Sequence, residues 1–179
     1  MNITESIFFT ESDSPNKKYR LDDKQFNADG RELYQIVAIK DFECQGRQIK
    51  SGDAGGLVSN DENLAWDDNS WIFDNAVVCD SARVYGDAMV AGDAIVSGGA
   101  IVADSARVYD EADITGLAEI YGNAKVFGNA RVDSDSFVHG NAEVFEDAVI
   151  TDGADIGGLC KIHGKAVVDY DVSEGDITD

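Results

Sequence analysis

Residues 119–132 read EIYGNAKVFGNARV, in which Ile120, Val126 and Val132 stand six positions apart. The same spacing continues without interruption through more than half of the chain. The aliphatic positions are Ile72, Val78, Val84, Val90, Val96, Val102, Val108, Ile114, Ile120, Val126, Val132, Val138, Val144, Ile150, Ile156, Ile162 and Val168. A small residue follows four positions after each of the first sixteen: Ala in fourteen cases, and Ser136 and Cys160 in the other two.

A period of six matches neither an α-helix, which repeats every ~3.6 residues, nor a lone amphipathic strand, which repeats about every two. Repetition at a fixed period is typical of stacked repeat proteins. Between the aliphatic and the small residue stand mostly Gly, Asp, Asn or Ser, which suit sharp turns. Each unit therefore reads as a short strand and a corner, and three units would close one triangular coil with Val or Ile inside. We predict an all-β parallel β-helix, roughly 27 Å long at ~4.8 Å per coil.

The composition divides the chain into four parts. Residues 1–17 are polar and are expected to be flexible. Residues 18–70 read as a small N-terminal β cap, which would cover the open strand edges of the first coil. Residues 71–172 are the predicted β-helix of about six coils, and residues 173–179 form an acidic tail.

Two strands are predicted in the cap, at 19–21 and 33–39, around a turn at 27–30. Residues 52–56 read Gly-Asp-Ala-Gly-Gly. This run lacks the Lys-Ser/Thr pair of a phosphate-binding loop, so we interpret it as a tight turn that leads into the first coil.

The cap carries the more specific part of a family resemblance, and the repeat carries the rest. The chain is similar to the YdcK-like β-helix proteins from about residue 18 to residue 168. The shared motifs are Tyr19-Arg20-Leu21, Gly30-Arg31, Gln35-Ile36, Ala38, Asp41-Phe42, Gly52-Asp53-x-Gly55-Gly56, Asn63-Leu64, Trp71-Ile72 and the Asn75-Ala76-Val77-Val78 type of repeat. The resemblance implies hexapeptide repeats, a left-handed helix and a bacterial or prophage setting. Members of the family are commonly labelled acyltransferases, a label that follows the fold.

The chain is strongly acidic, with 35 Asp and Glu against 14 Lys and Arg and a net charge of −21. This balance argues against direct binding of nucleic acid, which requires cations opposite the phosphates. No apolar run has the length of a membrane span. Three cysteines, an odd number without metal-site spacing, favour a reducing, cytoplasmic location. The acidity serves either solubility or the imitation of a polyanion.

Sorting the outward residues by coil places an aromatic stripe on one side of the prism. The stripe consists of Phe73, Ala91, Tyr109, Phe127, Phe145 and His163. A continuous apolar stripe marks an interface, and β-helices of this type are most often trimers, so we predict a homotrimer through this side, with a dimer as the alternative. The other interpretation is that these aromatic residues only cover the sheet.

One corner of the coil collects carboxylates, namely Asp74, Asp93, Asp110, Glu111, Glu146 and Asp147. Like charges at coil spacing repel one another. No loop shows the alternating pattern of a calcium site, so no metal is predicted. A protein partner that normally binds nucleic acid could recognise these charges, although ~4.8 Å per coil differs from the ~3.4 Å spacing of phosphates along DNA.

Acyl transfer from acetyl-CoA or another acyl-CoA needs a general base, for which only His139 and His163 are available. Both follow an inward aliphatic residue, and no loop interrupts the repeat to build a pocket, so we expect surface or interface roles for them. The sequence therefore favours a non-catalytic, cofactor-free binding protein. The more specific hypothesis is an inhibitor that mimics nucleic-acid charge. A CoA-dependent acyltransferase with sites between subunits is the alternative, and a structural spacer is the third class.

Overall fold

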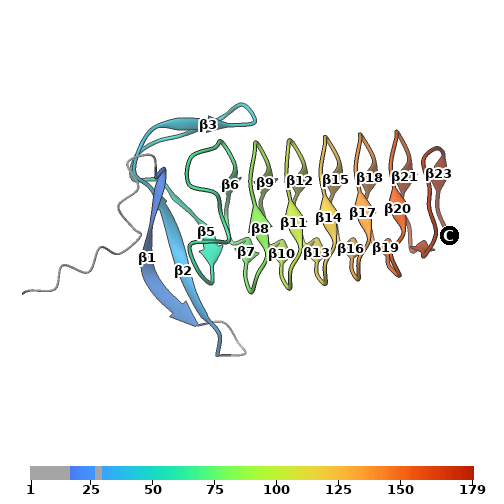
Figure 1. Cartoon of the computed structure of the whole chain (residues 1–179), viewed down its shortest axis with the longest axis horizontal. Coiled ribbons are helices and arrows are strands. Elements are labelled where there is room, and N and C mark those ends of the chain that lie inside the picture. Colours follow the sequence, from blue (N-terminus) through green and yellow to red (C-terminus); the bar gives the residue numbers. More distant parts are fainter. Residues whose placement is uncertain (1–16, 27–29) are drawn as a thin grey trace, which may run out of the picture.

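The computed structural model describes residues 17–26 and 30–179, and within these ranges the regular secondary structure consists of β-strands joined by turns. The chain forms a parallel β-solenoid with a cap at its N-terminal end, and the C-terminus lies at the opposite end (Figure 1). The described ranges contain no helix, and hence no apolar helix long enough to cross a membrane. The predicted flexible segment 1–17 lies outside the described residues except for Lys17.

Three sheets of short strands build the solenoid. The first sheet runs through β1 (Tyr19–Phe26), β2 (Glu32–Ala38), β5 (Ala54–Val58), β7 (Val77–Val78), β10 (Ile95–Val96), β13 (Asp113–Ile114), β16 (Arg131–Val132), β19 (Val149–Ile150) and β22 (Val167–Val168). The second contains β8 (Arg83–Val84), β11 (Ile101–Val102), β14 (Glu119–Ile120), β17 (Phe137–Val138) and β20 (Asp155–Ile156). The third contains β6 (Trp71–Ile72), β9 (Met89–Val90), β12 (Arg107–Val108), β15 (Lys125–Val126), β18 (Glu143–Val144), β21 (Lys161–Ile162) and β23 (Asp176–Ile177).

From β6 to β22 the strands of each sheet pair in parallel with residues eighteen positions away. Val96, for example, is opposite Val78 on one side and Ile114 on the other. One circuit through the three sheets therefore takes eighteen residues, and the strands inside each sheet are hydrogen-bonded to the coils before and after them. This register places equivalent side chains directly above one another along the solenoid.

The seventeen aliphatic residues spaced six apart fill the interior, and none is more than 1% exposed. The Ala residues that follow them are at most 7% exposed. The prediction that these side chains point inward is confirmed. Burial of a Val or Ile side chain stabilises a fold by roughly 1.5–3 kcal/mol, so the stacked column is the main source of stability.

The cap extends the first sheet with antiparallel strands. β1 pairs with β2, β2 pairs with β5, and β5 then pairs in parallel with β7, so the solenoid begins in the last strand of the cap. A separate hairpin of β3 (Phe42–Cys44) and β4 (Arg47–Ile49) turns through Gln45 and Gly46, both at positive φ. It lies along the solenoid beside β6 and β9 (Figure 1), where the Cys44 thiol approaches the Ala88 carbonyl.

The interpretation of residues 52–56 as one tight turn is wrong for Gly55 and Gly56, which lie inside β5. A Cβ at Gly55 would be 2.6 Å from the Ile72 carbonyl oxygen, and one at Gly56 would be 2.5 Å from that of Ala76. The two glycines are needed because β5 packs against the first coil without room for side chains.

Strand pairing also extends beyond residues 71–172 at both ends. Before this range Leu64 forms a bridge with Val84, and at its last residue Val172 forms one with Ile156. Residues 176–177, expected in a separate acidic tail, form β23 and pair with β21. The tail therefore continues the last coil.

Candidate macromolecule-binding surface

The acidic corner lies where the chain leaves the third sheet for the first. Asp74, Asp110 and Glu146 occupy equivalent positions two coils apart, at φ values of 56°, 61° and 60°. Each carboxylate accepts a hydrogen bond from the amide of the glycine one coil further along. These bonds join Asp74 to Gly92 at 3.2 Å, Asp110 to Gly128 at 3.3 Å and Glu146 to Gly164 at 2.8 Å.

The neighbouring position along this corner carries amides, carboxylates and one lysine: Asn75, Asp93, Glu111, Asn129, Asp147 and Lys165 in successive coils. Asn75 donates its side-chain amide to Asp93 at 3.0 Å, and Asn129 donates to Asp147 at 2.9 Å. Glu111 completes this row, and all six predicted acidic residues are exposed. Gly separates the acids of the first row, and in the second row only Asp93 and Glu111 directly follow one another. Like charges are therefore not stacked at every coil, and hydrogen bonds hold most of the carboxylates in place.

The same bond between a carboxylate and the next glycine amide occurs at the other corners. It joins Asp68 to Gly86 at 2.5 Å, Asp80 to Gly98 at 3.2 Å and Asp104 to Gly122 at 3.1 Å. Many acids of the repeat therefore stabilise the corners in addition to carrying charge. Sequence reasoning missed this role, although the recurrence of Gly eighteen residues after Asp was its visible signal.

The predicted aromatic stripe forms a stack of parallel rings. The ring centroids of Tyr109, Phe127, Phe145 and His163 follow one another at 4.9, 5.0 and 4.9 Å, with interplanar angles of 3–8°. The four rings are half-buried because they cover one another's faces. Their edges remain available to a partner.

The N-terminal end of the stripe is covered by the cap. The Arg47 guanidinium lies 3.9 Å from the centre of the Phe73 ring, and Phe73 is only 9% exposed. Gln45 of the same hairpin donates to the Asp87 carbonyl and accepts from Arg107. The part of the stripe that is open to solvent therefore begins at Tyr109.

An ion-pair ladder runs beside the rings on the third sheet. Glu143 lies between Lys125, at 2.7 Å, and Lys161, at 3.1 Å. Hydrogen bonds from Lys125 and Lys161 lower the pKa of the Glu143 carboxyl. This face is therefore close to charge-balanced, unlike the corner beside it.

The two candidate histidines each contact a carboxylate. His139 Nε2 lies 2.7 Å from Asp155, and its ring stacks on Tyr121 with a centroid distance of 5.1 Å. His163 Nε2 lies 2.7 Å from Asp176 of β23, and Nδ1 lies 3.7 Å from Glu146. The two histidines are on different sheets, and His163 fastens the last strand to the coil before it.

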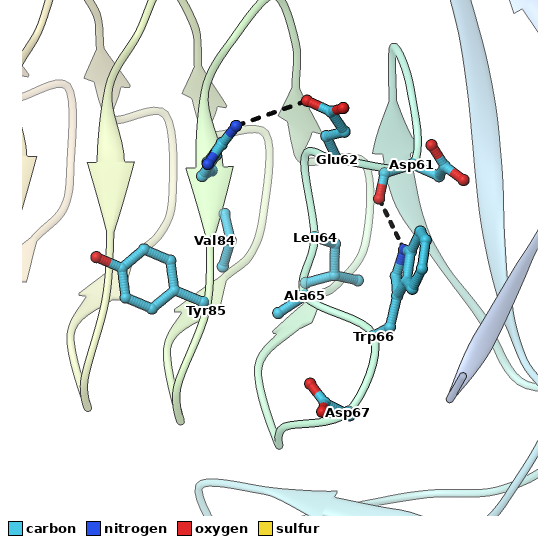
Figure 2. Close-up of a pocket in the computed structure, with 9 residues that line it drawn as sticks. Asp61, Glu62, Leu64, Ala65, Trp66, Asp67, Val84 and Tyr85 are labelled. Atoms are coloured by element: carbon cyan, nitrogen blue, oxygen red, sulfur yellow. Dashed lines mark hydrogen bonds and ion pairs between the residues drawn. The ribbon is translucent and has the colours of Figure 1, made fainter. Parts of the chain in front are cut away.

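A hollow of about 420 Å³ lies where the loop between β5 and β6 faces β8 (Figure 2). Trp66 and Tyr85 form its walls, with the buried Leu64 between them. The Trp66 indole donates to the Asp61 carbonyl at 2.9 Å, which fixes the ring. Sequence reasoning did not single out this place, because its two walls come from different coils.

Within the described residues, no three His, Cys, Asp or Glu side chains converge as metal ligands would. All three cysteines are buried and unpaired with one another. Burial raises the pKa of the Cys44 thiol to about 11 and also raises the pKa values of Cys79 and Cys160. These thiols are therefore held in their protonated, unreactive form at neutral pH.

The family model described as YdcK Beta solenoid repeat matches residues 82–98. The chain carries a YdcK-type solenoid repeat. The match covers about one coil, from just before β8 to just after β10. The resemblance to YdcK-like proteins is confirmed for this repeat, and it concerns the solenoid rather than any activity. No curated protein matches the chain.

Proposed function

We propose that this protein is a non-catalytic binding scaffold that presents a fixed array of carboxylates to a basic macromolecular partner. The observation that carries the proposal is the acidic corner, where five of six exposed acids each accept a hydrogen bond from the corner itself. A partner would meet charges that are already positioned, so little side-chain entropy is lost on binding.

The length of the acidic corner also suits a basic partner surface. Asp74 and Glu146 are four coils apart, which corresponds to roughly 19 Å at ~4.8 Å per coil. A basic surface of that extent is typical of proteins that bind nucleic acid. The specific form of the proposal is an inhibitor that occupies the nucleic-acid site of such a protein in the bacterial cytoplasm. The inhibitor is encoded by a bacterial or a prophage genome.

The proposed scaffold is a left-handed solenoid of three-sided coils built from hexapeptide repeats. The circuit of eighteen residues through three sheets supports the three-sided coil of six-residue units. We further propose that three copies associate through the open part of the aromatic stripe, from Tyr109 to His163, with a dimer as the alternative. The half-buried, parallel rings favour such packing because their edges form a continuous apolar line.

A second candidate function, CoA-dependent acyl transfer between subunits, is favoured by one observation. Asp155 lies 2.7 Å from His139 Nε2, as a carboxylate that orients a general base would. The scaffold is preferred because the Trp66–Tyr85 hollow lies three coils from His139, about 14 Å along the solenoid at ~4.8 Å per coil.

The test of the scaffold is capture of proteins from a bacterial lysate, followed by release with salt or with excess duplex DNA. We expect both to release the partner, because salt screens the charges and DNA competes for the same site. The triple variant Asp93→Asn, Glu111→Gln and Asp147→Asn should capture less. The matched control removes the same charge elsewhere, with Asp135→Asn, Asp152→Asn and Asp169→Asn, and should capture normally.

A partner that resists both salt and DNA would overturn the proposal, as would equal loss of capture in the two triple variants. Acyl-CoA turnover that disappears in His139→Ala would establish the second candidate instead.

A further inference from the structure

The hollow between the cap and the first coils combines aromatic walls with carboxylates. Trp66 and Tyr85 stand on two sides of it, and Asp61, Glu62 and Asp67 belong to its lining (Figure 2). Its volume of about 420 Å³ is within the usual range of ligand sites. An aromatic wall beside carboxylates is the combination that recognises an organic cation, through cation–π attraction and ion pairing.

The charge balance of the hollow also favours a cation. Arg83 is the one basic residue among the residues that line it, against three acids. Arg83 lies 3.6 Å from Glu62, and the two side chains are 61% and 76% exposed. Such an exposed pair holds its partners weakly, so an incoming cation can compete for Glu62.

A lysine of the protein itself already contacts two of the residues that line this hollow. The Lys17 ammonium lies 4.8 Å from the centre of the Trp66 ring and 3.6 Å from the Asp61 carboxylate. Lys17 does not line the hollow, so Tyr85 and Asp67 are left for another cation. Tyr85 is 42% exposed, which leaves its ring accessible.

We propose that the hollow receives a lysine or arginine side chain from a basic segment of the partner protein. This inference rests on the proposed scaffold function and adds a specific contact to its diffuse electrostatic attraction. The inserted side chain places its aliphatic stem along Ala65 and the Tyr85 ring, both of which reach the surface, and its cationic head between the Tyr85 ring and Asp67. The acidic corner then supplies long-range attraction, and the hollow supplies a fixed point of attachment.

The probes are a synthetic peptide of alternating Gly and Lys, its Gly-Arg counterpart and a Gly-Gln peptide of equal length. Binding is measured by tryptophan fluorescence on the intact chain. Trp71 is only 1% exposed, so the solvent-sensitive part of the signal comes from Trp66. We expect the Lys or Arg peptide to change the fluorescence and the Gln peptide to leave it unchanged.

The variants are Tyr85→Ala and Asp67→Asn, both at exposed positions, with Asp135→Asn as the charge-matched control far from the hollow. Loss of one cation–π contact should weaken peptide binding about threefold or more. We expect a similar effect of Asp67→Asn, and no effect of the control.

Three outcomes would overturn this inference: binding of the Gln peptide equal to that of the Lys and Arg peptides, no weakening in Tyr85→Ala, or equal weakening in Asp67→Asn and Asp135→Asn. If the corner triple variant still loses lysate capture in that case, the scaffold function stands and only the hollow is rejected. If the corner triple variant captures normally, the scaffold function fails separately.

Discussion

The Lys18 ammonium lies 2.5 Å from the Asp68 carboxylate, and Lys18 is fully buried. It also donates to the Ser70 hydroxyl and to the Asp68 carbonyl, both at 3.1 Å. Asp68 in turn accepts from the amide of Gly86 in the next coil. One ion pair therefore joins the cap to the solenoid.

We predict that Lys18→Ala lowers the free energy of unfolding by about 3 kcal/mol, because breaking a buried pair leaves a partly buried carboxylate without its cation. Urea denaturation measures the change. The exposed pair of Arg20 and Asp22 serves as the control, and Arg20→Ala should cost less than about 1 kcal/mol. Equal costs for the two variants would contradict the structural role of Lys18.

Stability should decrease in acid through specific carboxylates. Burial alone would raise the pKa of Asp68, but hydrogen bonds from Lys18 and Ser70 outweigh it, so the pKa is lowered. The pKa of Glu143 is lowered by hydrogen bonds from Lys125 and Lys161. Their contribution is complete above the unfolded pKa values, about 3.9 and 4.3, and is lost as the pH falls through the lower folded values.

The measurement is the urea midpoint from neutral pH down to about pH 3. We expect a fall that begins near pH 4 and is shallower in Glu143→Gln, which removes one of the titrating groups. A midpoint in Glu143→Gln with the same pH dependence as in the unmodified chain would show that this carboxylate contributes nothing.

Ser136 replaces the usual small apolar residue at one corner, and its buried hydroxyl has no hydrogen-bond partner. Ser136→Ala restores the Ala of the repeat and removes the cost of an unsatisfied polar group. We predict a gain in the free energy of unfolding of about 1 kcal/mol, measured by urea denaturation. A loss of stability would mean that the hydroxyl is satisfied in solution, for example by a buried water.

Close stacking of the corners should make some glycines irreplaceable. A Cβ at Gly98 would be 2.7 Å from the Gly116 carbonyl oxygen, whereas nothing lies within 4 Å of a Cβ at Gly153. Both residues have positive φ, so Gly→Ala costs about 1–2 kcal/mol of backbone strain at either position. We predict a larger loss of thermal stability in Gly98→Ala than in Gly153→Ala, and equal losses would contradict the tight contact between coils.

The proposed trimer is tested at the centre of the aromatic stack. Phe127→Lys places a charge between Tyr109 and Phe145, at an apolar contact between copies. We expect light scattering to give a trimeric mass for the unmodified chain and a monomeric mass for the variant, with circular dichroism unchanged. Ile95→Lys changes an exposed apolar residue on another sheet and should leave the mass unchanged. A monomeric mass for the unmodified chain would reject the oligomer.

The interior could be predicted from the sequence, because a six-residue period places every aliphatic residue at the same inward position of successive coil sides. The strands β1 and β2 were also predictable, since apolar residues stand on either side of a turn-prone segment: Leu21 before it and Leu33 and Ile36 after it. The parts of the fold that depend on contacts between residues far apart in the sequence could not be predicted. Gln45-Gly46 lacks the usual turn signature of Asn-Gly or Asp-Gly, so the β3–β4 hairpin gave no local signal.

The candidate surfaces were predicted as rows of residues but not as contacts. The spacing places the acidic residues in rows along one corner, yet the hydrogen bond from Gly128 to Asp110 depends on coil-to-coil geometry. Phe73 belongs to the aromatic row by its spacing, but Arg47 covers it from the cap. The hollow between Tyr85 and Trp66 could not be predicted, because it forms only where the loop before β6 packs against β8.

The eighteen-residue register means that each coil adds the same length to the solenoid. A duplicated or deleted coil would leave every inward and corner side chain in phase, while the insertion of a single residue would throw all later ones out of phase. The distance between the cap and the last coil is therefore free to change by gene duplication in steps of one coil, and each step adds the corner charges of the coil that is duplicated.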